Sequence, residues 1–81
     1  MAREDKQIEI IHRLSEILKG ERESKSISKN ELSQRSGLSR AAIRTIENGE
    51  KQPSIYSLLK ITNGLEVSLL KLLRLASKDA Q

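Results

Sequence analysis

The residues best suited to contact a ligand lie on one side of a short helix expected over residues 39–48. Ile43 and Ile46 share one face of this helix and can anchor it in a core. The opposite side carries Arg40, Ala41, Arg44, Thr45 and Asn48. Arg40 is the first residue after the helix cap, and its guanidinium could donate two hydrogen bonds to O6 and N7 of a guanine. A helix that is anchored on one side and presents arginine, alanine and threonine on the other suits the major groove of DNA.

An earlier short helix and a tight turn must position this helix. Ser28 and Glu31 form the S-x-x-E pattern of a capping box, so a helix is expected to begin after Ser28. Gly37 can adopt the left-handed conformation that ends a helix at little steric cost. Ser39 offers the N-cap hydroxyl of the next helix, and Gly49 closes that helix. Two helices joined by so short a turn must cross steeply around a small shared core.

The stretch from Ser28 to Gly49 resembles the helix-turn-helix of the phage lambda repressor and Cro family, the Xre-like regulators. The similarity continues into an E-x-G-x-x-x-P-S segment and two leucine-rich helices, and it covers roughly residues 14–73. The positions that carry this continuation are Glu47, Gly49, Pro53, Leu58, Leu65 and Leu69. The resemblance implies an all-α fold class, a compact five-helix lambda-repressor-like DNA-binding domain with its helix-turn-helix at the second and third helices.

The resemblance also implies roles for single residues. Ala41 and Thr45 match positions that read bases in the phage repressors, and here they could offer methyl contacts to thymine and one hydroxyl. Arg40 is the strongest base-reading candidate, with a phosphate contact as the alternative. Arg44 points between base edge and backbone, so its role is open. The expected phosphate contacts are Ser28, Lys29, Ser39, Asn48, Lys51 and Ser54. Family members often carry glutamine where this chain has Lys29, and that glutamine contacts the DNA backbone and braces the reading helix by a hydrogen bond. The charge of Lys29 still allows a phosphate contact, whereas the bracing hydrogen bond is left open.

Glu47, Gly37 and Gly49 are expected to hold the geometry of this segment rather than to contact bases. In the family, a basic residue of the first helix pairs with the glutamate that matches Glu47 and fixes the angle of the reading helix. Lys19 or Arg22 could supply that charge, depending on how many residues the connection after the first helix contains. The alternative is an ordinary surface glutamate near a helix end.

Composition restricts the classes of function. At this length the chain is expected to be one domain, residues 1–81, with frayed ends at about residues 1–5 and 77–81. It has no cysteine and one histidine, so no metal, cofactor or catalytic activity is expected. Residues 25–51 carry six basic and three acidic side chains, whereas residues 1–24 carry five and six. The basic excess coincides with the expected reading helix, as contact with phosphates requires.

The expected last helix is apolar over most of its surface. Its leucines are Leu69, Leu70, Leu72, Leu73 and Leu75. This is more leucine than one core face can bury, so we expect these residues to form a homodimer interface. A dimer would place two reading helices about 34 Å apart, in successive major grooves of a palindromic or near-palindromic operator.

The remaining boundaries follow from glycine and serine. A first helix is expected over residues 4–19 and ends at Gly20, followed by a loop or frayed helix end over residues 21–26. A fourth helix begins after Ser54 and ends at Gly64. No apolar run approaches the roughly 20 residues needed to cross a membrane, so a cytoplasmic protein without a membrane partner is expected.

Two classes of function stay open. The first is a sequence-specific regulator of transcription that binds double-stranded DNA, of the phage repressor, restriction–modification controller or antitoxin type. Its further partners would be RNA polymerase or a cognate toxin. The second is a helical protein-interaction module whose affinity for DNA is steep in salt and indifferent to sequence. The sequence does not distinguish activation from repression, and it does not define the operator.

Overall fold

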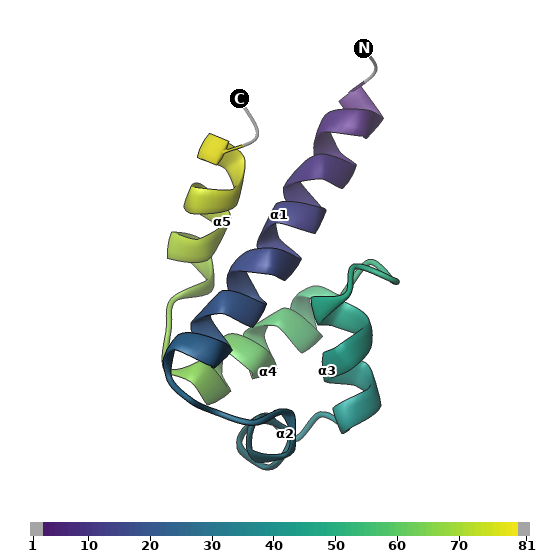
Figure 1. The fold of residues 1–81 in the computed structure, drawn as a ribbon. Helices are drawn as coiled ribbons and strands as arrows, with labels where there is room; N and C mark the ends of the chain where they lie inside the picture. The colour runs from purple at the N-terminus through teal and green to yellow at the C-terminus, as the bar shows by residue number, and fades with distance from the viewer. Residues whose placement is uncertain (1–2, 80–81) are drawn as a thin grey trace.

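The computed structural model describes residues 3–79, which form five helices and no strand (Figure 1). The helices are α1 (Arg3–Ser24), α2 (Lys29–Ser36), α3 (Arg40–Glu47), α4 (Ile55–Leu65) and α5 (Leu69–Asp79). The predicted all-α fold, with the helix-turn-helix at the second and third helices, is confirmed. None of the described helices is both long and apolar enough to span a membrane.

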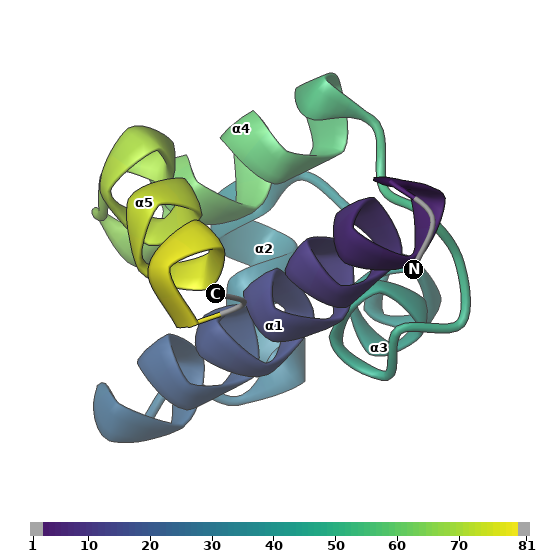
Figure 2. The same cartoon turned by 90° about the horizontal axis from the view of Figure 1, so that it is seen from above.

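The helices form two regions that share α1. α5 runs alongside α1 in the opposite direction, so the start of α1 and the end of α5 lie at the same end of the molecule (Figure 1). α2, α3 and α4 gather around the other half of α1, where α2 packs against both α3 and α4. Seen from above, α5 and α3 lie on opposite sides of α1 (Figure 2). The helix-turn-helix and the leucine-rich α5 are therefore separate surfaces of one small fold.

One aliphatic core joins the five helices. Its buried side chains are Leu14, Leu18, Ile27, Leu32, Ile43, Ile46, Leu58, Ile61, Leu65, Leu72 and Ala76. Each of the helices contributes at least one of them, and Ile27 adds the segment between α1 and α2. Full burial of one leucine or isoleucine stabilises a fold by about 1.5–3 kcal/mol, so this cluster is the main favourable contribution to folding.

The first helix is longer than the expected 4–19. It begins at Arg3 and continues through Gly20 to Ser24, so most of the expected loop or frayed helix end over residues 21–26 is helical. A Cβ atom at Gly20 would meet no atom within 4 Å, so this glycine faces open space. A glycine inside a helix costs about 1 kcal/mol relative to alanine. Gly20 therefore weakens α1 without ending it. The turn that follows α1 places Ser26 in the left-handed region, at φ 57°.

The frayed ends expected at about residues 1–5 and 77–81 stay a prediction, although the described helices reach into both ranges. α1 already begins at Arg3, and α5 continues to Asp79. Residues 1–2 and 80–81 lie outside the described residues. α1 and α5 pack against each other, and such long-range packing stabilises helices beyond what local propensity provides.

Gly64 does not end α4 as predicted. The helix continues to Leu65, and Glu66 adopts the left-handed conformation that closes it, at φ 59°. Gly64 is buried against α2, where an added Cβ atom would lie 3.1 Å from Leu32 Cδ1 and 3.3 Å from the backbone nitrogen of Ser36. This glycine is therefore a packing residue that lets α4 approach the first helix of the helix-turn-helix closely.

Candidate nucleic-acid interface

Serine caps and a left-handed glycine define α2 and α3, as the sequence predicted. The hydroxyl of Ser28 accepts a hydrogen bond from the backbone N–H of Glu31 at 3.0 Å, and Gly37 ends α2 with φ 81°. The hydroxyl of Ser39 accepts from the backbone N–H of Ala42 at 3.0 Å and begins α3. Only half of the capping box forms, because the Glu31 carboxylate pairs with Arg35 at 2.8 Å.

The turn between α2 and α3 is held by side chains as well as by backbone. The Ser33 hydroxyl donates a hydrogen bond to the carbonyl oxygen of Leu38 at 2.6 Å. The backbone N–H of Leu38 donates to the Ser36 hydroxyl at 3.2 Å. Leu32 of α2 and Ile43 of α3 are fully buried on either side of this turn. The crossing angle of the two helices is thus set by a shared core and two hydrogen bonds.

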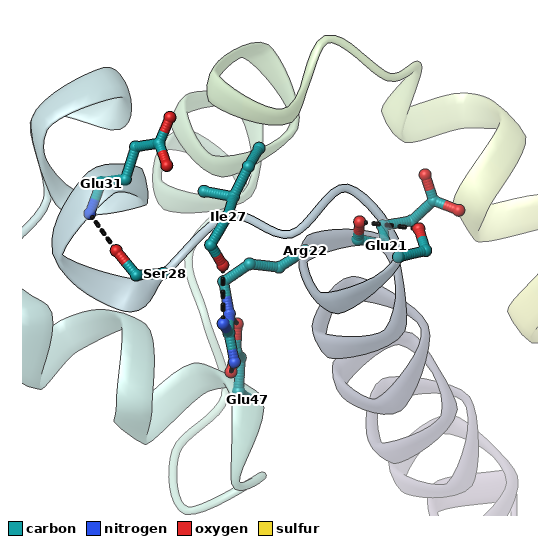
Figure 3. A network of polar contacts seen from close by, with 7 residues as sticks. Glu21, Arg22, Ile27, Ser28, Glu31 and Glu47 are labelled. Carbon is teal, nitrogen blue, oxygen red and sulfur yellow. Dashed lines mark hydrogen bonds and ion pairs between the residues drawn. The ribbon is translucent and has the colours of Figure 1, made fainter.

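A buried ion pair joins the end of α1 to the end of α3 (Figure 3). Arg22 donates from Nε to Glu47 Oε2 at 2.7 Å and from Nη2 to Glu47 Oε1 at 3.1 Å. Its Nη1 donates to the carbonyl oxygen of Ile27 at 2.8 Å. Of the two candidate partners of Glu47, Arg22 therefore forms the pair, and Lys19 is exposed. Glu47 is buried, so it is not an ordinary surface glutamate.

The electrostatics of the pair favour its ionised form. The hydrogen bonds that Arg22 donates to Glu47 raise the pKa of Arg22 above its ordinary value, and this effect exceeds the opposing effect of burial. The charges of Glu47 and Glu23 raise the pKa further. A buried pair whose hydrogen bonds are satisfied is costly to break, because removal of one partner leaves an uncompensated charge in the interior. The pair therefore fixes where α3 sits relative to the rest of the fold.

The exposed side of α3 has a basic flank that faces the start of α2. Arg40 and Arg44, one turn apart, line a surface hollow of about 440 Å³ together with Lys29 and Ala41. Among the described residues, the ion pairs are Arg22–Glu47 and the exposed Arg35–Glu31, so these three cations have no acidic partner. Three cations without an acidic partner make this concave surface positively charged, as contact with an anion requires. We refer to Lys29, Arg40, Ala41 and Arg44 as the basic flank.

A second hollow lies on the other side of α3, toward the start of α4. It measures about 350 Å³ and is lined by Ala41, Ala42, Thr45, Ile46, Lys51, Gln52, Pro53, Ser54 and Ser57. The Thr45 hydroxyl donates to the carbonyl oxygen of Ala41 at 2.8 Å. Because the hydroxyl hydrogen of Thr45 is used inside the helix, this side chain has a methyl group and an acceptor left for a ligand. We refer to Ala41, Ala42 and Thr45 as the apolar flank.

Three of the six predicted phosphate contacts lie around these two hollows. Lys29 borders the first hollow, and Lys51 and Ser54 border the second. Ser28 and Ser39 are the N-caps of α2 and α3, and each hydroxyl keeps its own hydrogen for a donor role.

The structure differs from the predicted phosphate contacts at Asn48 and at Ser57. The Asn48 amide donates to Glu50 Oε2 at 3.2 Å, so it is partly engaged within the protein. Ser57 lines the second hollow and accepts a hydrogen bond from the Ser54 hydroxyl at 3.1 Å. Ser57 was not among the predicted contacts, although its spacing of three residues from the cap of α4 is a usable signal.

The five leucines of α5 do not form one surface. Leu72 is 2% exposed and belongs to the core, so it is not available to a partner, and Leu69 and Leu73 pack against the same core. Leu70 and Leu75 remain, 60% and 43% exposed. They are five positions apart in the sequence, which places them about 140° apart around the helix. Leu72 is buried because α5 must cover α1, a constraint that the composition of α5 alone does not reveal.

The outer side of α5 carries a hollow on the Leu70 side. It measures about 410 Å³ and is lined by Leu70, Leu73, Arg74, Ser77 and Lys78. Leu75 is absent from this lining, in agreement with its position on another side of the helix. Within the described residues, no group of histidine and acidic side chains is arranged to hold a metal ion.

Comparison with known proteins gives one family and one group of solved structures. The model of the helix-turn-helix family HTH_3 matches residues 13–72. The wild-type restriction–modification controller protein C.Esp1396I is similar with a TM-score of 0.77 and 30% identity, over 86% of this chain and 91% of that chain. A triclinic crystal form of the same protein gives a TM-score of 0.78 with the same identity and coverage. No curated protein matches the sequence significantly.

Proposed function

The chain belongs to the helix-turn-helix family and is a DNA-binding regulator, and we propose that it binds double-stranded DNA in a sequence-specific way as a homodimer. In this proposal α3 lies in the major groove, Arg40, Ala41, Arg44 and Thr45 face the bases, and the whole chain works as a single domain. The operator is palindromic or near-palindromic. No catalytic step is part of this function.

The observation that carries the proposal is the contrast between the two sides of α3. Ile43 and Ile46 hold its inner side in the core, and Glu47 ties its end to Arg22. The outer side keeps Arg40 and Arg44 exposed and without an acidic partner. A rigid helix that presents unpaired arginines has the chemistry needed to contact guanines and phosphates.

The phosphate contacts follow from the same placement. Lys29 beside α3 on one side, and Lys51 and Ser54 on the other, can meet the two strands that border a major groove. Ser28, Ser39 and Asn48 stay candidates at the helix ends. These contacts fix the register of the protein on the duplex, whereas the bases are read by α3.

The homodimer uses the Leu70 side of α5 in this proposal. Leu70 is the most exposed leucine of α5, and with Leu73 it lines a hollow that a second copy can fill. A single small module contacts too little DNA for strong specific binding, and two copies double the contacts. Leu69 and Leu73 can contribute their exposed edges, Leu75 can take part only from another side of the helix, and Leu72 has no surface to contribute.

The type of regulator is proposed from the solved structures. The two similar structures described above are of a restriction–modification controller protein, which favours this type over the phage repressor and antitoxin types. The partner of such a regulator beyond DNA would be RNA polymerase, and a cognate toxin only if the chain is an antitoxin. The alternative of a protein-interaction module with non-specific DNA affinity is addressed by the following experiment.

Selection of bound sequences from a random duplex pool tests the function directly. We expect the wild-type protein to enrich an inverted repeat, and Arg40→Ala to lose one G·C preference in each half-site at a cost of about 1–3 kcal/mol. Arg35→Ala is the matched control, because it removes an arginine that is paired with Glu31 on α2. It should keep every base preference. No enrichment by the wild type, with binding that disappears at moderate salt, would instead identify the protein-interaction module.

A further inference from the structure

We infer that the apolar flank of α3 recognises the 5-methyl group of a pyrimidine, either thymine or 5-methylcytosine, next to the base pair that Arg40 reads. The inference rests on the proposed docking of α3 in the major groove. It adds a chemical class of ligand to that function: each half-site contains a pyrimidine that is recognised by its methyl group, so cytosine methylation at this place strengthens binding.

The first step is the division of the exposed side of α3 into two rows. Arg40 and Arg44 form one row, and Ala41 and Thr45 form the next, about 100° further around the helix. The two surface hollows agree with this division, since one contains both arginines and the other contains Ala42 and Thr45. Ala41 lines both hollows. The basic flank and the apolar flank thus meet at Ala41 and would face adjacent base pairs.

The second step is the chemistry left to the apolar flank. Ala41 and Ala42 carry no polar side-chain atom, and Thr45 donates its hydroxyl hydrogen to the carbonyl oxygen of Ala41. The flank can therefore donate no hydrogen bond from a side chain to a base edge. The apolar group that a base pair presents in the major groove is the 5-methyl group of thymine. A methyl group on C5 of cytosine projects from the equivalent ring position.

The third step is the shape of the hollow beside this flank. Ala41, Ala42, Ile46 and Pro53 provide apolar surface, and the hollow of about 350 Å³ has room for a methyl group. Its remaining lining is polar and comes from the end of the α3–α4 loop and the start of α4: Lys51, Gln52, Ser54 and Ser57. A strand whose phosphates meet these polar residues would place its base edges toward the apolar flank. A bulkier residue at position 42 would reduce this space.

The expected magnitude follows from the area of one methyl group. Burial of one such group changes a dissociation constant by about fourfold, or by about fifteenfold when both half-sites of a dimer are changed. This is smaller than the effect expected for a bidentate arginine contact. The methyl group therefore tunes the choice between similar operators, while Arg40 supplies the larger discrimination.

The experiment uses duplexes that contain the selected inverted repeat. Each thymine of the half-site is replaced in turn by 2′-deoxyuridine, which removes only the methyl group, and binding is measured by fluorescence anisotropy at fixed salt. We expect one position in each half-site, next to the G·C pair lost in Arg40→Ala, to weaken binding about fifteenfold when both copies are changed. At the same position, 5-methylcytosine opposite guanine should bind more tightly than cytosine by a similar factor.

Two conservative variants show whether the methyl group of Thr45 takes part in recognition of the base methyl group. Thr45→Ser keeps the hydroxyl and removes the methyl group, so the difference between thymine and deoxyuridine should shrink. Thr45→Val removes the hydroxyl and keeps a methyl group, so the difference should persist. The opposite result, with discrimination lost in Thr45→Val and kept in Thr45→Ser, would show that the hydroxyl reads the base and would overturn the inference. Circular dichroism of both variants establishes that α3 is folded.

The failure of this inference is distinct from failure of the proposed function. If the wild type enriches an inverted repeat but neither deoxyuridine nor 5-methylcytosine changes its affinity at any position, the regulator stands and methyl recognition is wrong. If no sequence is enriched from the random pool, the docking of α3 itself is wrong and the inference fails with it.

Discussion

The helix-turn-helix, α2 and α3, differs from the helices α4 and α5 in the large side chains that it leaves exposed. Around α3, the large aliphatic side chains Ile43 and Ile46 are buried, while Arg40 and Arg44 stay exposed without acidic partners. On α4 and α5, large apolar side chains are exposed beside polar and charged ones: Ile55, Tyr56, Leu59, Leu70 and Leu75. Cations without an acidic partner favour binding to an anionic molecule, and exposed leucines favour contact with an apolar surface. The two regions therefore have different partners, which we propose to be DNA and a second copy of the chain.

The two regions also differ in how they are held. The helix-turn-helix region is tied by the buried Arg22–Glu47 pair, whereas the described part of α5 is held mainly by apolar packing on α1. A directional pair fixes the orientation of a reading helix in a way that apolar contacts alone do not. The predictions below test this contrast, from the largest expected effect to the smallest.

Loss of the buried pair should have the largest effect. Glu47→Gln leaves the Arg22 charge buried without its partner and should lower the free energy of unfolding by about 3–5 kcal/mol. Urea unfolding followed by circular dichroism measures this change. Glu31→Gln, in the exposed pair with Arg35, is the control and should cost less than about 1 kcal/mol. Equal losses of unfolding free energy in the two variants would show that the buried Arg22–Glu47 pair stabilises the fold no more than a surface pair does.

A double replacement separates stability from orientation. Arg22→Met with Glu47→Leu fills the same space with apolar groups and should recover most of the stability lost in Glu47→Gln. If the pair serves to orient α3, operator affinity should stay reduced in this folded double variant. Full recovery of both stability and affinity would show that the pair has no orienting role.

Two glycines offer a matched test of packing. Gly64→Ala should destabilise the fold by about 1–3 kcal/mol, because the new Cβ would press on Leu32 and on the backbone of Ser36 in α2. Gly20→Ala meets open space and should stabilise α1 by up to about 1 kcal/mol. Thermal unfolding monitored by circular dichroism shows whether each substitution lowers or raises the melting temperature. A stabilising Gly64→Ala would mean that the close contact between α2 and α4 is not needed for this fold.

The α5 surface can be tested without disturbing the core. Leu70→Gln changes an exposed side chain, so the unfolding free energy of the monomer should change little, while the dimer should weaken by at least about tenfold. Sedimentation velocity over a range of concentrations measures the dimer. Leu75→Gln is the matched control on a different side of the helix and should leave the dimer intact. A dimer that survives Leu70→Gln but not Leu75→Gln would place the interface on the other side of α5.

The smallest effect should come from single phosphate contacts. Lys51→Gln should weaken binding about equally for all DNA sequences and reduce the slope of log affinity against log salt by about 1 per protomer. Titrations at several salt concentrations give this slope. Lys71→Gln, on α5, is the control with the same loss of charge and should leave the slope nearly unchanged. A change in base preference in Lys51→Gln would assign this lysine to the bases instead of the backbone.

Local patterns in the sequence were sufficient for much of this structure. Serine at positions 28, 39 and 54 and glycine at position 37 predicted where α2, α3 and α4 begin and where α2 ends, because capping depends on neighbouring residues. The leucine and isoleucine spacing predicted which side of α3 enters the core. The arginine-bearing side of α3 followed from the same spacing, so the candidate site was identified along with the fold.

Tertiary structure alone decided the features that depend on distant residues. Arg22 rather than Lys19 meets Glu47 because α1 continues past Gly20, and that extension is stabilised by contacts 25 residues away in the chain. Gly64 packs on α2 instead of ending α4, and Leu72 is buried under α1 instead of facing a partner. The division of α3 into basic and apolar flanks also required its neighbours α2 and α4. Helix propensity and caps act over a few residues, whereas burial depends on which helices meet in space.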